Sequence, residues 1–205
     1  MRDRELEGKM SDKSSLKIGY FHGRFQPFHM GHAWVIEEAL KSVDKLIIGF
    51  SNPFRQPAIL DDAMREDDAV AKKFGSTRAL SNNPWPMWAR ELMVIEGLAS
   101  MGQIDLRRIM FVPNLSNSGL DVNEMVPPGN LVTIFIVGKE EHNRAKEKQY
   151  LSEGYSVVSL DEFDFGGSGT EIRRRIREGE SWEDLVPDGT AKVIKWLGEL
   201  NMGPK

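Results

Sequence analysis

Short apolar runs separated by helical patterns organise most of this 205-residue chain. Between the runs, apolar residues recur every three or four positions, which predicts helices. A strand, a helix and a strand within roughly 35 residues form a βαβ unit, which imposes a right-handed crossover and a parallel sheet. Five runs are typical of strands, at about 16–21, 45–50, 109–112, 131–137 and 155–160. We therefore expect an α/β fold with a doubly wound, five-stranded parallel, Rossmann-like sheet and C-terminal helices.

The helical patterns fall between and after these runs. Gly102 and Gly179 follow two of the patterns, as expected where helices end. Helices are predicted at about 31–43, 88–99, 140–152 and 170–177, and helical cover at 181–187 and 191–200.

Two segments do not follow this alternation. Residues 1–15 are charged and hold too few large apolar groups to dock, so we expect a disordered arm. Residues from about 54 to 82 combine a charged helix candidate with a polar loop, and we interpret them as an insertion. A solvated excursion is favoured over a substrate lid. The remaining chain, 16–205, is then a single domain.

Composition excludes several classes of partner and of chemistry. With 27 basic and 31 acidic residues, the chain has no bulk attraction to nucleic acid or anionic membrane, so phosphate binding must be local. No apolar segment approaches the ~20 residues of a membrane span, and no signal peptide precedes the first strand, so we expect a cytoplasmic protein. The chain has no cysteine, which excludes disulfides, thiolate catalysis and cysteine-ligated zinc.

The stretch Gly23-Arg24-Phe25-Gln26-Pro27-Phe28-His29-Met30-Gly31-His32, called the first motif below, joins the first strand to the first helix. The unpaired amides and the positive dipole end of such a helix start form an anion site, usually occupied by phosphate. Arg24, His29 and His32 add cationic or hydrogen-bonding groups there. Two histidines at this spacing can also reflect packing or a metal pair. Only His22 and His142 could complete a metal site, so we expect none.

Residues 166–173, called the second motif below, open the helix predicted at 170–177. Ser168 and Glu171 have the spacing of a capping box, and the glycines before them let backbone amides approach an anion. Arg173 lies in the first turn, and its guanidinium fork can bind two phosphate oxygens. Taken alone, this pattern is more often a structural cap; together with the first motif it favours a phosphate site.

Both motifs resemble the signatures of a known enzyme family. Residues 23–32 look like the H-x-G-H signature of the nucleotidyltransferase superfamily, in the G-R-F-Q-P form of archaeal-type nicotinamide mononucleotide adenylyltransferases. Residues 168–175 resemble that family's S-x-T-x-x-R segment near the C-terminus. The two matches stand in the right order, each at a junction between a strand and a helix.

A third match concerns an Asn-Pro-Phe segment that the family carries, with an arginine seven residues beyond the asparagine. Asn83-Pro84-Trp85 has Arg90 at that spacing, whereas Asn52-Pro53-Phe54 has Ile59. We align the former segment, which makes Arg90 a candidate phosphate ligand.

The resemblance implies transfer of AMP from ATP to a phosphorylated acceptor, most simply nicotinamide mononucleotide, giving NAD and pyrophosphate. Mg²⁺ is expected to arrive with ATP, and Trp85 or Trp88 to stack on the nicotinamide ring. No other metal, nucleic acid or membrane partner is expected, and a homo-oligomer is left open. The implied catalytic residues are His29, His32, Arg24 and Arg173, and the implied ATP ligands are Gly23, Phe25, Gly31, Arg90, Gly138, Ser168, Thr170 and Arg174.

Two other functions stay open on these residues. An adenylyl- or cytidylyltransferase for a different phosphate-bearing acceptor would keep both motifs and change only the middle of the chain. A non-catalytic nucleotide-binding regulator would not need the histidines and Arg173.

Overall fold

The computed structural model describes residues 16–52, 82–114, 125–138, 141–161 and 163–204. The expected disordered arm at 1–15 lies outside these ranges, as does nearly all of the insertion predicted at 54–82. No helix in the described part of the chain is both long and apolar enough to cross a membrane.

One sheet of five parallel strands forms the centre of the fold, in the order β3-β2-β1-β4-β5. Each strand coincides with one of the predicted apolar runs. The strands are β1 (Ile18–Gly23), β2 (Lys45–Phe50), β3 (Ile109–Pro113), β4 (Val132–Val137) and β5 (Ser156–Leu160). The predicted fold class is confirmed, and the strand order reverses between β1 and β4.

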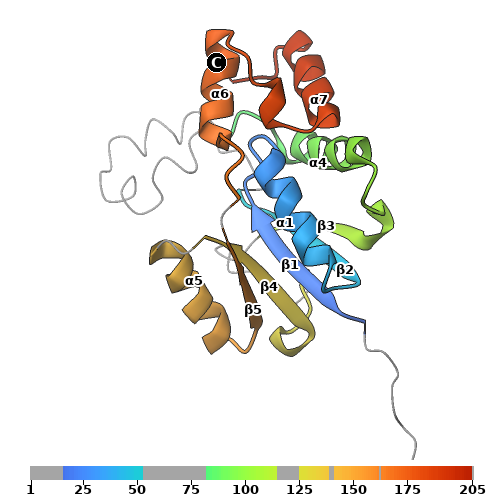
Figure 1. Cartoon of the computed structure of the whole chain (residues 1–205), viewed down its shortest axis with the longest axis vertical. Coiled ribbons are helices and arrows are strands. Elements are labelled where there is room, and N and C mark those ends of the chain that lie inside the picture. Colours follow the sequence, from blue (N-terminus) through green and yellow to red (C-terminus); the bar gives the residue numbers. More distant parts are fainter. Residues whose placement is uncertain (1–15, 53–81, 115–124, 139–140, 162, 205) are drawn as a thin grey trace, which may run out of the picture.

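Helices cover the two faces of the sheet unequally (Figure 1). Residues of α1, α4, α6 and α7 join the apolar cluster of one face, with α7 packed on α4, whereas Tyr150 of α5 belongs to the apolar cluster of the opposite face. The helices are α1 (Met30–Leu40), α4 (Met87–Met101), α5 (Glu141–Ser152), α6 (Gly169–Glu178) and α7 (Asp188–Glu199). Short 3₁₀ turns occupy Leu106–Arg108, Gly129–Leu131 and Glu183–Leu185.

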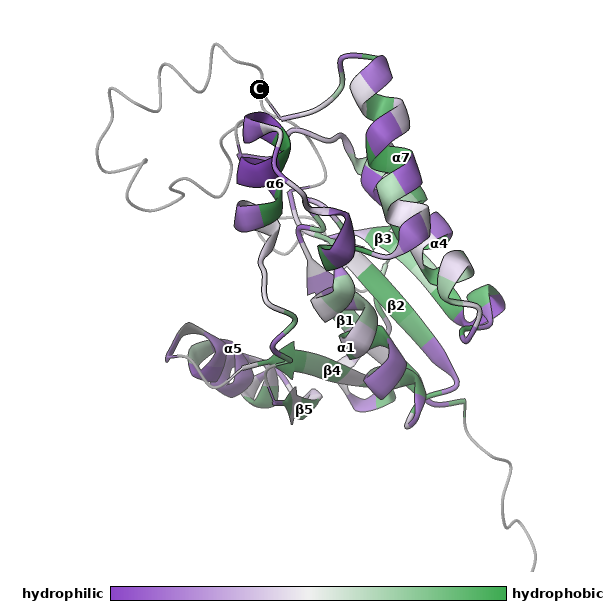
Figure 2. Ribbon diagram, turned by 45° about the horizontal axis from the view of Figure 1, so that its top comes forward, coloured by the Kyte–Doolittle hydropathy of each residue, from purple (hydrophilic) through white to green (hydrophobic). Residues whose placement is uncertain are grey.

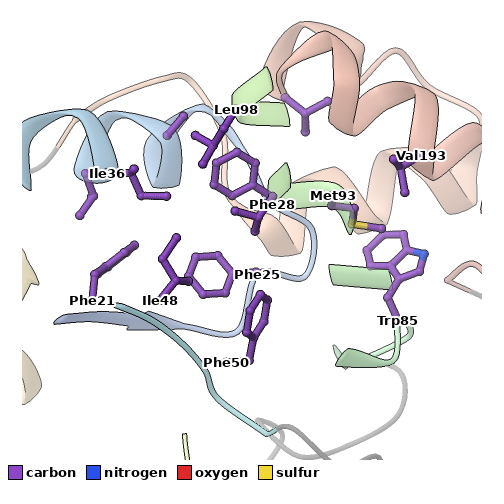
Figure 3. Close-up of a cluster of buried hydrophobic side chains, with 14 of the residues drawn as sticks. Phe21, Phe25, Phe28, Ile36, Ile48, Phe50, Trp85, Met93, Leu98 and Val193 are labelled. Atoms are coloured by element: carbon purple, nitrogen blue, oxygen red, sulfur yellow. The ribbon is translucent and has the colours of Figure 1, made fainter. Parts of the chain in front are cut away.

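The main core lies between the sheet and the larger group of helices. Strands β2 and β4 are apolar along most of their length, while purple, hydrophilic stretches appear on α5, α6 and α7 (Figure 2). In Figure 3, aromatic rings of the first motif and of β1 and β2 meet Met93 and Leu98 of α4. This burial fixes the end of β1, where the first motif begins.

The first helix ends three residues earlier than predicted, at Leu40 instead of Val43. At this end of the helix, the guanidinium of Arg108 donates hydrogen bonds to the backbone carbonyls of both residues. A side chain from the 3₁₀ turn before β3 therefore binds the last carbonyls of this helix end. The 3.6-residue pattern cannot reveal such a contact, because Val43 is buried in either case.

Candidate functional site

A pocket of about 340 Å³ opens at the carboxyl ends of β1 and β4, where the strand order reverses. Ligands bind at this position in doubly wound sheets. The start of α1 and residues 163–168, which precede α6, form two of its walls, and α5 contributes Asn143 and Lys146. Both sequence motifs therefore contribute to one cavity.

His29 and His32 stand side by side in this pocket. Their ring centroids are 3.6 Å apart, and the ring planes differ by 22°. His29 is the N-cap of α1, and its carbonyl accepts hydrogen bonds from the amides of His32 and Ala33. The Nδ1 atoms of both histidines are buried and have no hydrogen-bond partner among the described residues. Since both rings line the pocket, their other edges are the ones available to a ligand.

Burial keeps both imidazoles neutral. It lowers the pKa of His29 to about 3. Burial places the pKa of His32 well below its ordinary value, and electrostatic interactions with the His29 ring and the Arg24 guanidinium lower it further. A neutral imidazole at a helix N-terminus can donate one N–H hydrogen bond to an oxyanion, but it lacks the second, acidic proton that an imidazolium could transfer. The pair thus suits charge stabilisation better than general acid catalysis.

Gln26 holds the turn between β1 and α1. Its side-chain amide donates to the Trp85 carbonyl at 2.8 Å and accepts from the Trp85 amide at 3.2 Å. Its own carbonyl accepts a hydrogen bond from Nη1 of Arg173. The first motif is therefore attached both to the segment before α4 and to the second motif.

The structure gives Arg173 a supporting position. Its side chain is only 2% exposed, and Nη2 contacts the side-chain oxygens of Thr170 and Asn82 at 3.2 and 3.4 Å. Burial, followed by the charges of Arg24 and Arg177, lowers its pKa to about 10. Together the three arginines give this side of the site a positive potential. Arg24 does not itself line the pocket, although its charge acts on His32 within it.

Arg90, the predicted phosphate ligand, contacts backbone carbonyls in this structure. It is fully buried, and its two terminal nitrogens donate to the carbonyls of Arg24, Ser51 and Asn52 at 2.8 to 2.9 Å. Burial lowers its pKa to about 10. In this structure Arg90 ties the end of β2 to the first motif, and it does not line the pocket.

Arg174 and the two tryptophans do not line the pocket either. Arg174 is held at the surface by Glu171, Glu178 and Glu180, so carboxylates occupy its guanidinium. Trp85 is fully buried in the main core beside Met93 (Figure 3), where no acceptor ring can reach it.

Trp88 is 49% exposed and packs against Trp196 of α7, outside the pocket. The helical spacing of Trp88 suggests a core residue, but the core-facing side of α4 is formed by its neighbours Ala89, Met93 and Leu98.

The second motif caps α6 as its sequence suggests, in part. Ser168 Oγ accepts from the Glu171 amide at 3.1 Å, but the Glu171 carboxylate turns to Arg174 and Arg175 instead of completing the box. Ser168 and Gly167 line the pocket, so the start of α6 reaches the same cavity as the start of α1. Thr170 faces Arg173 rather than the cavity.

The remaining candidates of the first motif and of the β4 turn have distinct places. Gly23 and Gly31 line the pocket. Phe25 is buried, and its ring packs against that of His32 with centroids 4.7 Å apart. Gly138 turns with φ +81°, and Asn143 donates to the neighbouring Val137 carbonyl at 2.7 Å. Val137 and Asn143 line the pocket beside it.

Sequence reasoning missed several aromatic residues of the pocket, among them Trp34, Phe163 and Phe165. Trp34 and Phe163 stack with ring centroids 5.5 Å apart, and Phe165 stacks on His29. Trp34 was detectable, because it shares a helix face with Gly31. The two phenylalanines were not detectable, because they lie roughly 130 positions after α1 in the sequence and contact it only in the folded chain.

His22 is a further pocket residue that sequence reasoning left without a role. Its Nδ1 lies 3.3 Å from Ser51 Oγ and 3.2 Å from Asn114 Nδ2, and its Nε2 lies 3.1 Å from the Tyr150 hydroxyl. Burial, with the charge of Lys146, lowers its pKa to about 4. His22 thus joins the ends of three strands to α5.

The described residues include no group of three or more His, Asp or Glu side chains that could hold a metal ion. No carboxylate lines the described pocket. A divalent cation at this site would therefore take most of its oxygen ligands from bound phosphates and water.

The chain is similar to known nucleotidyltransferases. Residues 20–59 match the family model described as cytidylyltransferase-like. A nicotinamide-nucleotide adenylyltransferase of Pyrococcus furiosus is 32% identical over 188 residues, which cover 88% of this chain and 84% of the relative. A phosphonoformate cytidylyltransferase of Streptomyces viridochromogenes is 27% identical over 92% of this chain and 96% of its own.

A solved structure supports the fold. The bifunctional NMN adenylyltransferase/ADP ribose pyrophosphatase of Francisella tularensis, complexed with AMP and a manganese ion, superposes with a TM-score of 0.63 at 20% identity. The match covers 89% of this chain but 49% of that longer one. By its similarity over most of its length to the Pyrococcus furiosus enzyme, the chain belongs to the nucleotidyltransferase family that includes the archaeal nicotinamide-nucleotide adenylyltransferases.

Proposed function

We propose that this nucleotidyltransferase transfers AMP from ATP to nicotinamide mononucleotide, forming NAD and pyrophosphate. The observation that carries the proposal is the meeting of two helix starts, those of α1 and α6, in one pocket with a stacked pair of neutral histidines. A triphosphate can bridge two such anion-binding helix starts. The relatives named as nicotinamide-nucleotide adenylyltransferases support the choice of substrates.

The chemistry requires positioning more than proton transfer. An oxygen of the acceptor phosphate attacks the α-phosphorus of ATP, the bond from that phosphorus to the bridging oxygen breaks, and pyrophosphate leaves. The attacking phosphate is already an anion near neutral pH, so no general base is needed. In this proposal, His29 and His32 donate hydrogen bonds to the phosphates, and the Ser168 end of α6 binds the leaving pyrophosphate.

Two further elements complete the donor site. Mg²⁺ entering with ATP would neutralise phosphate charge, held mainly by the phosphates themselves. The adenine would lie between the aromatic pair Trp34–Phe163 and the turn at Gly138, because this pair and Val137, the residue before the turn, line the pocket. Stacking on aromatic rings tolerates different bases. The donor base therefore needs a direct test.

The test combines two donors with several acceptors. The purified chain is incubated with Mg²⁺, with ATP or CTP, and with nicotinamide mononucleotide, other phosphomonoesters or phosphonoformate, and pyrophosphate release is followed. A variant with His29→Gln and His32→Gln serves as the background control. Pyrophosphate with ATP and nicotinamide mononucleotide, accompanied by NAD, supports the proposal. Release only with another acceptor contradicts it, and no release with any pair favours a nucleotide-binding regulator.

A cytidylyltransferase is the second candidate. It is favoured by the 27% identity to the Streptomyces viridochromogenes enzyme over nearly the whole length of both chains. Faster turnover with CTP than with ATP in the same assay would select it.

A further inference from the structure

Phe165 belongs to neither predicted phosphate motif, yet its ring stacks on one face of the His29 imidazole. The two ring centroids are 4.6 Å apart and the planes differ by 17°. His32 covers the opposite face of the same imidazole at 3.6 Å. The His29 ring is therefore enclosed between two parallel rings, one from α1 and one from the segment before α6.

The backbone around Phe165 holds its ring in this place. Gly166 turns with φ +74°, and its amide donates to Asp164 Oδ1 at 2.9 Å, which closes the turn. The ring lies so close to α1 that a Cβ added at Gly31 would come within 2.8 Å of it. Gly31 of the first motif thus provides space for the Phe165 ring.

We propose that Phe165 is a positioning residue for the nucleotidyl transfer, which fixes the His29 imidazole edge-on to the pocket and shields it from water. Rings stacked on both faces block rotation of the imidazole about its Cβ–Cγ bond. The pocket then meets a nitrogen edge in a defined direction, as charge stabilisation requires. Phe165 precedes Ser168 by three residues, so this link also makes the geometry of His29 depend on the correct placement of the α6 start.

Shielding by Phe165 has a measurable consequence. Burial is the cause of the lowered His29 pKa, and the titratable group packed against its ring is the neutral His32. A smaller, non-aromatic side chain at position 165 would admit water to one face of the imidazole. The pKa of His29 should then rise toward the ordinary histidine value.

The experiment is an NMR titration of the histidine ring protons in the ligand-free full chain. There are four histidines, and a His29→Gln variant identifies the signal of His29. The test variant is Phe165→Leu, and Phe163→Leu is its matched control, because Phe163 lies in the same segment and stacks on Trp34 instead. Phe165→Tyr tests whether another aromatic ring restores the effect.

In the unmodified chain and in Phe163→Leu, His29 should stay neutral above about pH 5, as its low pKa requires. In Phe165→Leu it should begin to titrate above that pH, while His22 keeps its titration and reports an intact fold. The same variant should lower kcat about tenfold, with a smaller change in KM for ATP, as expected when one charge-stabilising donor is misplaced. Phe165→Tyr should restore both properties.

An unchanged His29 titration in folded Phe165→Leu would overturn the proposal. So would a tyrosine variant that behaves like the leucine variant. The titration needs no nucleotide, so it also distinguishes failure of this inference from failure of the proposed adenylyl transfer, which would appear only in the activity measurement.

Discussion

Arg173 and Arg174 are neighbours in sequence, yet their guanidinium groups meet different partners. Arg173 is buried and donates to the Gln26 carbonyl, whereas Arg174 is 37% exposed and surrounded by carboxylates. Arg173→Met would leave that buried carbonyl unsatisfied and separate the two motifs. We expect it to lower the free energy of unfolding by about 3 kcal/mol. Denaturant-induced unfolding measures this loss.

Arg174→Met is the matched control for this change, because it replaces the same residue type on the same helix. Exposed ion pairs contribute little to stability, so Arg174→Met should change the free energy of unfolding by no more than about 1 kcal/mol. If the two variants proved equally stable, the hydrogen bond from Arg173 to Gln26 would not be what joins the motifs.

His32 gives a prediction about catalysis. Its ring stands against Phe25, and its buried Nδ1 leaves the opposite edge for a phosphate oxygen. Removing one such donor typically lowers turnover by a factor of 10² or more, so we expect His32→Ala to lower kcat on the order of 10²-fold. Pyrophosphate release measures the rate, and circular dichroism checks the fold. An unchanged kcat would assign His32 a purely structural role.

The sequence indicated which residues belong to the site better than what each of them contacts. The two histidines, Ser168 and the glycines at 23 and 31 line the pocket, and their helix-start chemistry is local enough to be visible in sequence. The contacts of Arg90 were not predictable, because an arginine at the expected spacing looks the same in sequence whether it binds phosphate or backbone carbonyls. Only tertiary contacts, such as those with Ser51 and Asn52, distinguish the two cases.

At the scale of elements, α4 and α7 pack more closely than any pattern of apolar residues could show. Gly189, in the first turn of α7, lies against the backbone of α4, and a Cβ there would come within 1.9 Å of the Glu96 carbonyl oxygen. Backbone cannot move aside as a flexible side chain can. We therefore expect Gly189→Ala to destabilise the protein by about 3 kcal/mol, at the upper end of overpacking costs.

Gly198, near the other end of α7, provides the control. A Cβ added there would meet nothing within 4 Å. Because alanine is the better helix former, Gly198→Ala should be neutral or stabilise by up to about 1 kcal/mol. Thermal unfolding of the two variants compares these effects, and a Gly189→Ala protein as stable as Gly198→Ala would show that the helices can separate without cost.

The elements themselves were predictable because each strand coincides with an apolar run. A run such as Leu46–Phe50 is buried on both faces, which is the situation in which periodicity and burial agree. The association of residues 163–165 with α1 was not predictable, since it depends on how a chain segment returns across the sheet. Phe163 and Phe165 are pocket residues of this kind, and Asn143 and Lys146 reach the pocket from α5.

For the molecule as a whole, the net charge of −4 coexists with a locally positive site. Arg24, Arg173 and Arg177 lie close enough that the charges of the other two lower the pKa of Arg173. A triphosphate would meet this local field rather than the average charge of the surface. Attraction to nucleic acid requires an extended basic surface, and the composition of the chain gives no such excess.

Three neutral histidines make the stability of the whole protein depend on pH. Burial lowers the pKa of His22 to about 4 and of His29 to about 3, and places that of His32 well below its ordinary value. In the unfolded chain each should titrate near 6.5. Below that pH the unfolded state binds more protons than the folded state, so acid favours unfolding. The stabilisation is complete above about pH 6.5 and is lost as the pH falls toward the folded values.

Each histidine could cost up to about 2 kcal/mol between pH 7 and pH 5, since one pKa unit corresponds to about 1.4 kcal/mol. Water screens these partly exposed rings, so we expect about 1 kcal/mol from each and a total near 3 kcal/mol. The lowered carboxylate pKa values, such as that of Glu171 at about 2, act below this window. Urea unfolding at the two pH values measures the difference. His29→Gln should reduce this loss of unfolding free energy between pH 7 and pH 5 by about a third. Equal stability at pH 7 and pH 5 would mean that the histidines are solvated and protonate freely in the folded protein.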